Sequence, residues 1–329
     1  MTFSFGLPVR LVPLAKGLAT RLPGGDRLAA GTVKVRRPSA AKSYAIWLKH
    51  LGLAVRHGME GPPASLVEIG PGGDLGVGLA ALLSGADHYR GLDVVPSADL
   101  AATRELVGAL AALFAARAPR ARPGWPETEH LGDTGAFPRH ILDDARLARA
   151  LDPQRLAALA RLVGGEGGED DEGDEDGGGR TFAYVAPWDG RGIAPAGTVG
   201  MVVSHAVMQH VDDPRAAYRA VAAALAPGGY ATHQIDFCSM NLTRHWNGHW
   251  GCPDGLWAVV RGRRPYLINR LPLSGHLDLI RDAGTEVVAV LARARSGGIP
   301  RRDLAEPWRS LGDDDLNCAE AFIVSRARG

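Results

Sequence analysis

The fold is decided by the stretch Leu66-Val67-Glu68-Ile69-Gly70-Pro71-Gly72-Gly73. Apolar residues lead into a carboxylate and a glycine turn follows at once, which predicts a buried strand that ends in a tight turn. Glycine tolerates positive φ and has no Cβ, so the backbone of such a turn can approach a ligand closely. The stretch therefore predicts a βα unit with a ligand at its turn.

A second apolar run, Tyr89-Arg90-Gly91-Leu92-Asp93-Val94-Val95, carries an acid near its end. An acid about 20 residues beyond a glycine turn is the usual acceptor for ribose hydroxyls in nucleotide-binding βαβ units. A dinucleotide site would also place a third glycine at the helix opening, where phosphate binds free N–H groups. Asp74 stands there and would repel phosphate, which disfavours a nicotinamide dinucleotide. Glu68 suits a cationic ligand group.

These motifs resemble those of the class I S-adenosylmethionine-dependent methyltransferases. The first motif of that family, acid-x-Gly-x-Gly, is matched by Glu68, Gly70 and Gly72, and its ribose-binding acid by Asp93. Later stretches fit in order: 199–206 resembles the fourth strand, 207–214 the "leHv-dp" segment after it, and 225–230 the turn before the fifth strand. The resemblance covers roughly residues 40–240 well, although Gly200 replaces the acid that usually opens the fourth strand.

The resemblance implies an α/β fold with a Rossmann-like seven-stranded mixed sheet flanked by helices, and with insertions that form a substrate cap. It implies S-adenosyl-L-methionine as cofactor. Trp188 would stack on adenine and Asp189 would accept from its amino group, although plain loop packing serves equally well. The expected cofactor-binding residues are Tyr44, Glu68, Gly70, Pro71, Gly72, Asp93, Trp188, Asp189, Ser204 and His205.

Composition and the lack of sustained periodicity predict an N-terminal arm at 1–38, and the resemblance implies a methyltransferase domain at 39–329. The arm holds proline, glycine and basic residues without sustained periodicity, and docking on the domain is expected rather than anchoring on a membrane. A helical insertion at about 120–180 exceeds an ordinary crossover, and residues 238–270 are expected to cap the substrate. No run reaches the ~18 apolar residues of a membrane span, so the protein is expected to be cytoplasmic, without membrane partners.

Helices and strands are expected in a regular order. The predicted helices are 39–53, a segment ending near 84, 98–116, 153–162, 213–226 and 274–283, and the predicted strands are 64–69, a segment ending near Asp93, 181–185, 199–206, 229–237, 285–292 and 318–326.

Charge is distributed unevenly. The 37 basic and 36 acidic residues give a formal net charge of +1, but residues 164–179 hold eight of the acids and no base. A glycine-acid tract buries no apolar area, so it predicts a disordered loop, more simply a tolerated insertion than an electrostatic gate. The basic remainder favours an anionic acceptor. No Lys/Arg run or aromatic platform indicates nucleic acid.

Cysteine usage argues against a disulfide framework, because Cys238, Cys252 and Cys318 are odd in number and form no close pair. With His245 and His249, the first two could supply four zinc ligands. Tight paired spacing is missing, however, so no metal is expected.

Three residues are candidate general bases. His210 follows the fourth strand, and histidine titrates near neutral pH; a histidine that only packs is the alternative. Asp236 lies near the end of the fifth strand, on the face opposite His233. His249 lies in the cap insertion, whose mixed polar and aromatic residues suit a pocket wall, or a surface insertion. There the arginines could clamp phosphate or carboxylate. The expected substrate-binding residues are His245, Trp246, Asn247, Arg263, Arg264 and Arg270.

The resemblance therefore implies methyl transfer to a polar small molecule, O-directed rather than N- or C-directed, in secondary-metabolite or sugar/polysaccharide biosynthesis. A protein or peptide methyltransferase and a non-catalytic binding protein of the same fold are the alternatives. Acceptor and oligomeric state are left open.

Overall fold

The computed structural model describes residues 8–25, 38–73, 75–120, 135–163, 179–190 and 192–328. Asp74 lies outside these residues, and so does the acidic tract except for Gly179. What the sequence predicts for Asp74 and for the tract stays a prediction. No helix in the described ranges is long and apolar enough to cross a membrane.

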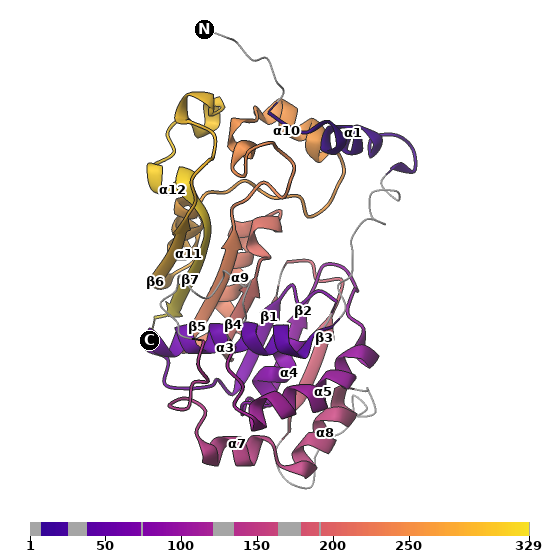
Figure 1. Cartoon of the computed structure of the whole chain (residues 1–329), viewed down its shortest axis with the longest axis vertical. Helices are drawn as coiled ribbons and strands as arrows, with labels where there is room; N and C mark the ends of the chain where they lie inside the picture. Colours follow the sequence, from indigo (N-terminus) through magenta and orange to yellow (C-terminus); the bar gives the residue numbers. More distant parts are fainter. Residues whose placement is uncertain are drawn as a thin grey trace.

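Seven strands form one mixed sheet in the order β3-β2-β1-β4-β5-β7-β6 (Figure 1). Strands β1 to β5 pair in parallel, and β7 runs antiparallel to both of its neighbours, β5 and β6, so that β7 alone among the seven opposes the others. The strands are β1 (Ser65–Ile69), β2 (His88–Leu92), β3 (Thr181–Val185), β4 (Val199–His205), β5 (Leu225–Asp236), β6 (Thr285–Ala294) and β7 (Cys318–Ala327). The expected fold is confirmed. Strand order reverses between β1 and β4, which is where open α/β sheets bind ligands.

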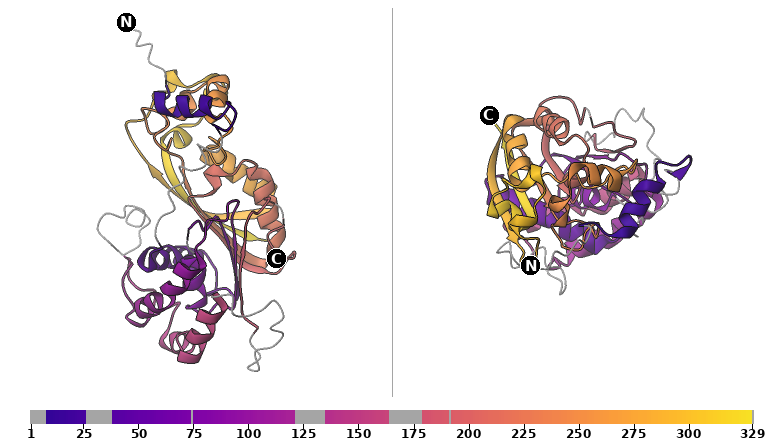
Figure 2. Two further views of the ribbon diagram at one scale, coloured as in Figure 1. Left: turned by 90° about the vertical axis from the view of Figure 1, so that its right-hand side faces the viewer. Right: turned by 90° about the horizontal axis from the view of Figure 1, so that it is seen from above.

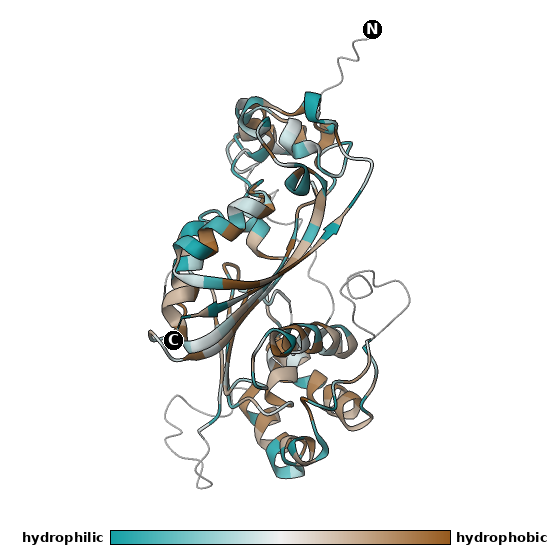
Figure 3. Ribbon diagram, turned by 90° about the vertical axis from the view of Figure 1, so that its left-hand side faces the viewer, coloured by the Kyte–Doolittle hydropathy of each residue, from teal (hydrophilic) through white to brown (hydrophobic). Residues whose placement is uncertain are grey.

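Helices flank the sheet (Figures 1 and 2). A mutually packed group consists of α3 (Ala40–Arg56), α4 (Gly76–Leu82) and α5 (Leu100–Ala115), with α7 (Asp144–Ala150) and α8 (Pro153–Val163) beyond it. A second packed pair consists of α9 (Pro214–Ala224) and α11 (Leu273–Asp282). Apolar residues concentrate in the first group (Figure 3). The other helices are α1 (Leu11–Ala19), α10 (Asp254–Arg261) and α12 (Asp313–Asn317), with short 3-10 turns at Met208–His210, Gly248–Gly251, Arg301–Asp303 and Glu306–Trp308.

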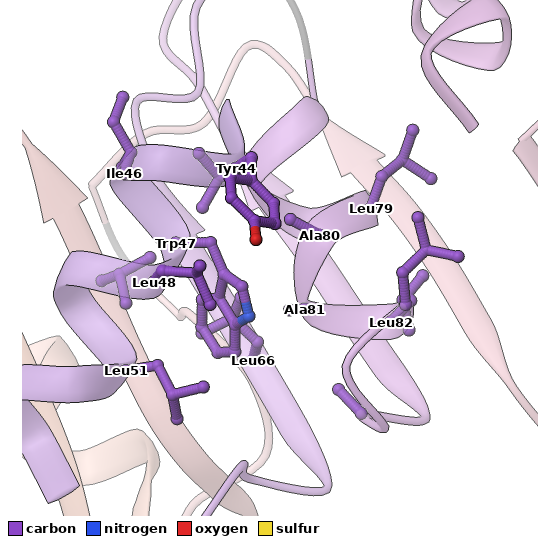
Figure 4. Close-up of a cluster of buried hydrophobic side chains, with 14 of the residues drawn as sticks. Tyr44, Ile46, Trp47, Leu48, Leu51, Leu66, Leu79, Ala80, Ala81 and Leu82 are labelled. Atoms are coloured by element: carbon purple, nitrogen blue, oxygen red, sulfur yellow. The ribbon is translucent and has the colours of Figure 1, made fainter. Parts of the chain in front are cut away.

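Helix α3 shows why these segments fold as the periodicity predicts. The Ser39 side chain caps its start by accepting from the backbone N–H of Lys42, which satisfies one of the free donors of the first turn. Trp47 and Leu51 are buried between α3, α4 and β1 (Figure 4), and each large apolar side chain buried in this way contributes about 1.5–3 kcal/mol. The Trp47 indole donates to Ser84 Oγ at 2.8 Å, so its one polar group is paired.

Two features differ from the sequence-based expectation. Residues 11–19 form a helix, although no periodicity marked it; Pro13 is tolerated because it stands in the first turn, where its missing N–H is not needed. Strand β5 starts at Leu225 instead of 229 because Leu225 already pairs with Val199. The register then shifts before Tyr230, and Gly228 supplies the positive φ of +73° within this irregularity.

The cap, defined here as residues 8–25 together with 238–270, lies beyond the carboxyl ends of the central strands (Figures 1 and 2). Helix α1 packs on α10, and Gly17 is required there because a Cβ would overlap the Val259 carbonyl oxygen. A small apolar cluster forms the cap interior: Val9, Leu242, Cys252, Trp257, Val260 and Ile268.

Candidate active site

The glycine turn lies at the carboxyl end of β1. Gly70 and Gly72 have φ values of +71° and +76°, which only glycine adopts readily. A Cβ on Gly70 would lie 2.5 Å from Val207 Cγ2, whereas a Cβ on Gly72 would meet nothing within 4 Å. Gly70 therefore lets the segment after β4 pack on the turn, while Gly72 borders open space where a ligand can approach.

The acid that follows β2 meets this turn. Asp93 Oδ2 accepts from the Gly72 N–H at 3.0 Å, and Oδ1 accepts from the Val95 N–H at 3.3 Å. The side chain is only half-buried, so a ribose can compete for its oxygens. The structure thus brings together the two motifs that the sequence singled out.

Glu68 lies beneath the turn and is buried. The Tyr89 hydroxyl donates to Glu68 Oε2 at 2.8 Å, and this side chain pair fills the space beside Gly78, where a Cβ would overlap the Tyr89 ring. These contacts give Glu68 a structural function; its contact with a cationic ligand group stays a prediction.

The end of β4 carries a chain of buried polar groups that the sequence analysis missed. His205 is half-buried, and its Nδ1 lies 3.3 Å from His50 Nε2. His50 is fully buried and its Nδ1 lies 2.7 Å from Thr232 Oγ1. Burial, aided by the neighbouring His205 and Lys49, holds the pKa of His50 well below its usual value, so its ring is neutral. The relay Thr232–His50–His205 thus orients His205 at the strand end.

Ser204, the residue before it, points elsewhere. Its hydroxyl is fully buried and lies 2.8 Å from Nδ1 of His233. Alternation along the strand separates it from His205. Only the backbone of Ser204 remains available for its predicted contact with the cofactor.

His210 is held in one tautomer. Its Nδ1 lies 2.7 Å from the Tyr266 carbonyl oxygen, which can only accept, so Nδ1 carries the proton and Nε2 carries the lone pair. Burial lowers the pKa of His210, while the Tyr266 carbonyl and the negative charge of Asp236 oppose that shift. The ring is therefore neutral at pH 7, with Nε2 able to take up a proton.

The second candidate base lies close enough to affect the first. Asp236 ends β5, and its Oδ1 accepts from the Cys238 N–H at 2.7 Å. Because its charge acts on His210, the structure groups these two candidates at one edge of the sheet.

His249 is not part of this group. It is 2% exposed inside the cap, with its ring centroid 4.5 Å from that of Trp250. Burial, assisted by the charge of Arg270, lowers the pKa of His249 to about 3. The ring packs in the cap interior, its Nδ1 has no hydrogen-bond partner, and its function as a base stays a prediction.

The loop 266–270 attaches the cap to the segment that carries His210. Asn269 N donates to the Gln209 carbonyl at 2.7 Å, and Asn269 Nδ2 donates to the Met208 and Val211 carbonyls at 2.9 and 3.0 Å. Burial, with the charges of Asp93 and Asp212, raises the pKa of Tyr266. Tyr266 therefore lies near Asp93, although more than 170 residues of sequence separate the two, and local patterns could not reveal this proximity.

Gln209 is a further residue that the sequence analysis did not single out. Its side chain is 3% exposed, and neither the oxygen nor the nitrogen of its amide has a hydrogen-bond partner. Buried polar groups are rarely left in this state. Because it adjoins His210 in the turn after β4, it is a candidate ligand contact.

Two of the predicted substrate residues are held by contacts with other parts of the protein. Arg270 is 9% exposed; it donates to the Cys252 carbonyl at 2.8 Å and to Asp254 at 2.6 Å, and it stacks between Trp257 and Trp308. Asn247 is buried, donates to the Leu316 carbonyl at 3.0 Å and accepts from the Ile299 N–H at 2.7 Å. These contacts account for both side chains without a substrate.

The remaining predicted substrate residues lie nearer the surface. Arg264 donates to the backbone carbonyls of Pro13 and Val260. Trp246 Nε1 donates to the Ser296 carbonyl at 3.1 Å, and His245 Nδ1 lies 3.4 Å from the Gly297 carbonyl. Arg263 is exposed. The structure does not gather these four with Asp93 and His210, so their contact with an acceptor stays a prediction.

Tyr44 is also distant from the turn. It is 2% exposed, its hydroxyl donates to the Ala118 carbonyl at 2.7 Å, and its ring lies edge-on to Phe114 at 4.9 Å. Helix α5 starts beside the turn, because the backbone N–H of Asp99 donates to the Gly73 carbonyl, and the helix rises about 1.5 Å per residue. Tyr44 therefore contacts the end of α5 that is remote from the glycine turn.

The loop after β3 lies close to Asp93, as expected. Trp188 N donates to the Asp93 carbonyl at 2.7 Å. The Trp188 side chain is 7% exposed and packs in the apolar cluster that includes Val67 and Leu92, while Asp189 is exposed. Packing explains Trp188 at least in part, and adenine contact by either residue stays a prediction.

Neither a metal-ligand cluster nor a disulfide is found in the part of the chain that the structure describes. Among the described residues, no three His, Cys, Asp or Glu side chains are grouped to hold a metal ion. Cys238, Cys252 and Cys318 are free, and burial raises the pKa of each thiol.

No protein-family model and no curated protein matches the chain. Solved structures resemble it in fold. A putative sarcosine dimethylglycine methyltransferase from Galdieria sulphuraria has a TM-score of 0.44 and 7% identity, over 92% of this chain and 98% of that one. A putative methyltransferase in complex with the Haloferax volcanii Trm112 activator has a TM-score of 0.40 and 14% identity, over 95% and 98%. The [4+2]-cyclase SpnF has a TM-score of 0.39 and 12% identity, over 98% and 99%. At these values we carry over no activity from them.

Proposed function

We propose that this chain is a class I S-adenosylmethionine-dependent methyltransferase that acts on a polar small molecule, with O-directed transfer favoured. The observation that carries the proposal is the hydrogen bond between the Gly72 N–H and the half-buried carboxylate of Asp93. Gly72 also borders open space. The turn that bears Gly72 adjoins the segment with His210, because Gly70 packs against Val207. A biosynthetic function in secondary metabolism or polysaccharide formation, in the cytoplasm, belongs to the same proposal.

The residues at the turn fit the cofactor. The backbone at 70–72 would lie against it, Asp93 would accept from the ribose hydroxyls, and the loop at Trp188 and Asp189 would border the adenine. When bound, S-adenosylmethionine supplies a strongly electrophilic methyl group. The task left for the protein is then to align an acceptor with it, and alignment alone can contribute several kcal/mol.

For a hydroxyl acceptor, His210 would take the proton at Nε2. Its Nδ1 proton is committed to the Tyr266 carbonyl, which keeps the ring oriented while Nε2 becomes protonated. The negative charge of Asp236 favours the imidazolium that results. A positioned base of this kind contributes roughly 10²- to 10⁴-fold.

His205 is a second candidate for the same step. If His205 Nδ1–H donates to His50 Nε2 and His50 Nδ1–H donates to Thr232, the outer Nε2 of His205 holds a lone pair. The position of His205 favours it, because Ile69 at the end of β1 pairs with Ser204. His205 therefore lies level with the glycine turn. The two histidines are distinguished by separate substitutions, described below.

Titration calorimetry tests the cofactor assignment. We expect binding of S-adenosylmethionine and its demethylated product, and no binding of NAD. Asp93→Ala should weaken the binding by about 1–3 kcal/mol, because charge-assisted bonds to ribose are lost. Binding of NAD alone, or unchanged affinity in Asp93→Ala, would contradict the proposal.

A further inference from the structure

Helix α1 is apolar apart from Lys16, although only one side of it is covered. Gly17 is buried against α10, and Leu14 packs on the apolar cluster of the cap. A helix that is apolar on all sides is ordinarily buried on all sides. The opposite side of α1 is nevertheless exposed, and at helical spacing it carries Leu11, Val12, Ala15, Leu18 and Ala19.

The exposure is large. Leu11 is 71% exposed, Val12 65%, Leu18 51% and Leu22, just beyond the helix, 64%. These four are the most exposed large apolar side chains in the described ranges. Single exposed apolar residues are ordinary, but a contiguous group indicates an interaction surface.

Positive charge surrounds this surface. Arg10 precedes the helix, Lys16 lies at the edge of its exposed side and Arg21 follows it, and residues 8–25 contain no acid. A cavity of about 890 Å³ between α1 and the loop at 240–244 adds Arg244 and Arg264, again without an acidic residue in its wall. The outer side of α1 is therefore apolar at its centre and cationic at its rim.

We propose that α1 lies in the surface of a membrane that contains anionic lipid. Leu11, Leu18 and Leu22 would enter the boundary between headgroups and acyl chains, and the rim cations would contact lipid phosphates, as in other interfacial amphipathic segments. A second copy of the chain fits this surface poorly, because it would oppose two cationic rims. This proposal is independent of methyl transfer, and it replaces the expectation of an arm that only docks on the domain.

The position of α1 in the molecule permits this contact. Helix α1 lies at the end of the molecule opposite α7 and α8 (Figures 1 and 2). A planar surface can approach it there without displacing the sheet. Contact at α1 would also hold the cap, and with it the edge of the sheet that carries His210, near the membrane.

Sedimentation with vesicles tests the proposal on the full chain. Vesicles of phosphatidylcholine alone are compared with vesicles that contain roughly a quarter phosphatidylglycerol. We expect binding to the mixed vesicles only, weakened by salt, and reduced about tenfold or more in the double variant Leu18→Asp, Leu22→Asp. Lys16→Glu should weaken binding as well. Val290→Asp, at an aliphatic residue of β6 that is 38% exposed, and Arg161→Glu on α8 are the matched controls and should bind as the wild type does.

Three results would overturn the proposal. One is absence of binding to mixed vesicles, and another is equal binding to both vesicle types. The third is unchanged binding in the double variant. A dimer in light scattering that Leu18→Asp dissociates, without vesicle binding, would assign the surface to a second copy instead. The melting temperature of each variant shows that it folds, and Leu18→Ser serves if the aspartate variant does not.

Discussion

The glycine turn and the cap both contain polar residues of the kinds found in ligand sites, but these residues make different contacts in the two regions. At the turn, the Asp93 carboxylate is half-buried and Gly72 borders open space. In the cap, Arg270 and His249 are buried and make contacts within the cap itself. The same residue types thus leave groups available for a ligand in one region and hold the structure together in the other.

The physical reason lies in the size of the cap. Its apolar cluster is small, and buried polar groups in such a region need partners, since an unpaired one costs about 1–3 kcal/mol. Arg270 meets this need through carbonyl oxygens, a carboxylate and two indole faces. A high density of polar and aromatic residues is therefore weak evidence for a pocket wall when the segment must also build its own interior.

The largest effect is expected at the turn. Gly72→Val should reduce cofactor binding below detection, because the side chain would occupy the open space beside Asp93. The positive φ adds only about 1–2 kcal/mol of strain, so the protein should remain folded. Calorimetry and thermal melting measure the two effects separately. Wild-type affinity in this variant would place the cofactor away from the turn. The turn would then be no more available to a ligand than the cap is.

A smaller effect is expected in the cap, and on stability instead of binding. Arg270→Ala should lower the free energy of unfolding by about 1–3 kcal/mol, because the buried Cys252 carbonyl loses its donor and the two indole rings lose their packing partner. Arg263→Ala, at an exposed side chain, is the control and should change it by less than about 0.5 kcal/mol. Denaturant unfolding and KM are measured together. Unchanged stability with a raised KM would show that Arg270 clamps the acceptor after all.

Substitutions of the candidate bases should differ in their effect on kcat. His210→Ala should lower kcat about 10²-fold, equivalent to about 2.7 kcal/mol, with cofactor affinity nearly intact. His249→Ala should instead lower stability with little effect on kcat in the folded fraction. A collapse of kcat in His205→Ala, with a normal rate in His210→Ala, would assign the proton to the relay Thr232–His50–His205. Normal rates in both would favour an acceptor that is already deprotonated.

The smallest effect is a shift in pH dependence. His210 must be neutral to accept a proton, and burial lowers its pKa, so activity should fall only as pH drops through a value below 6.5. The charge of Asp236 raises that pKa; removing it in Asp236→Asn should therefore move the acidic limb of kcat/KM to still lower pH. A limb that stays in place or moves upward would show that Asp236 does not act on the base.

The resemblance to a known family implied the sheet, whereas most element boundaries were predicted from local patterns of apolar, glycine and proline residues. Strand β3 was predicted with its observed bounds, Thr181–Val185, and α8 within one residue of its end. Helix α1 was missed because apolar residues lie on both its covered and its exposed side and Pro13 interrupts the stretch, which obscures a helical period. The early start of β5 was missed because it depends on pairing with Val199 across an irregular register.

By itself, the sequence determined the βα unit at the glycine turn and the pairing of that turn with Asp93, since glycine φ preferences and strand order follow from nearby residues. Tertiary structure alone decided which polar side chains stay available. His210 is fixed by the carbonyl of Tyr266, His205 by His50, and Arg270 by Trp257 and Trp308. Each of these partners is distant in sequence, and a hydrogen bond or ring contact depends on positions in space that no local pattern encodes.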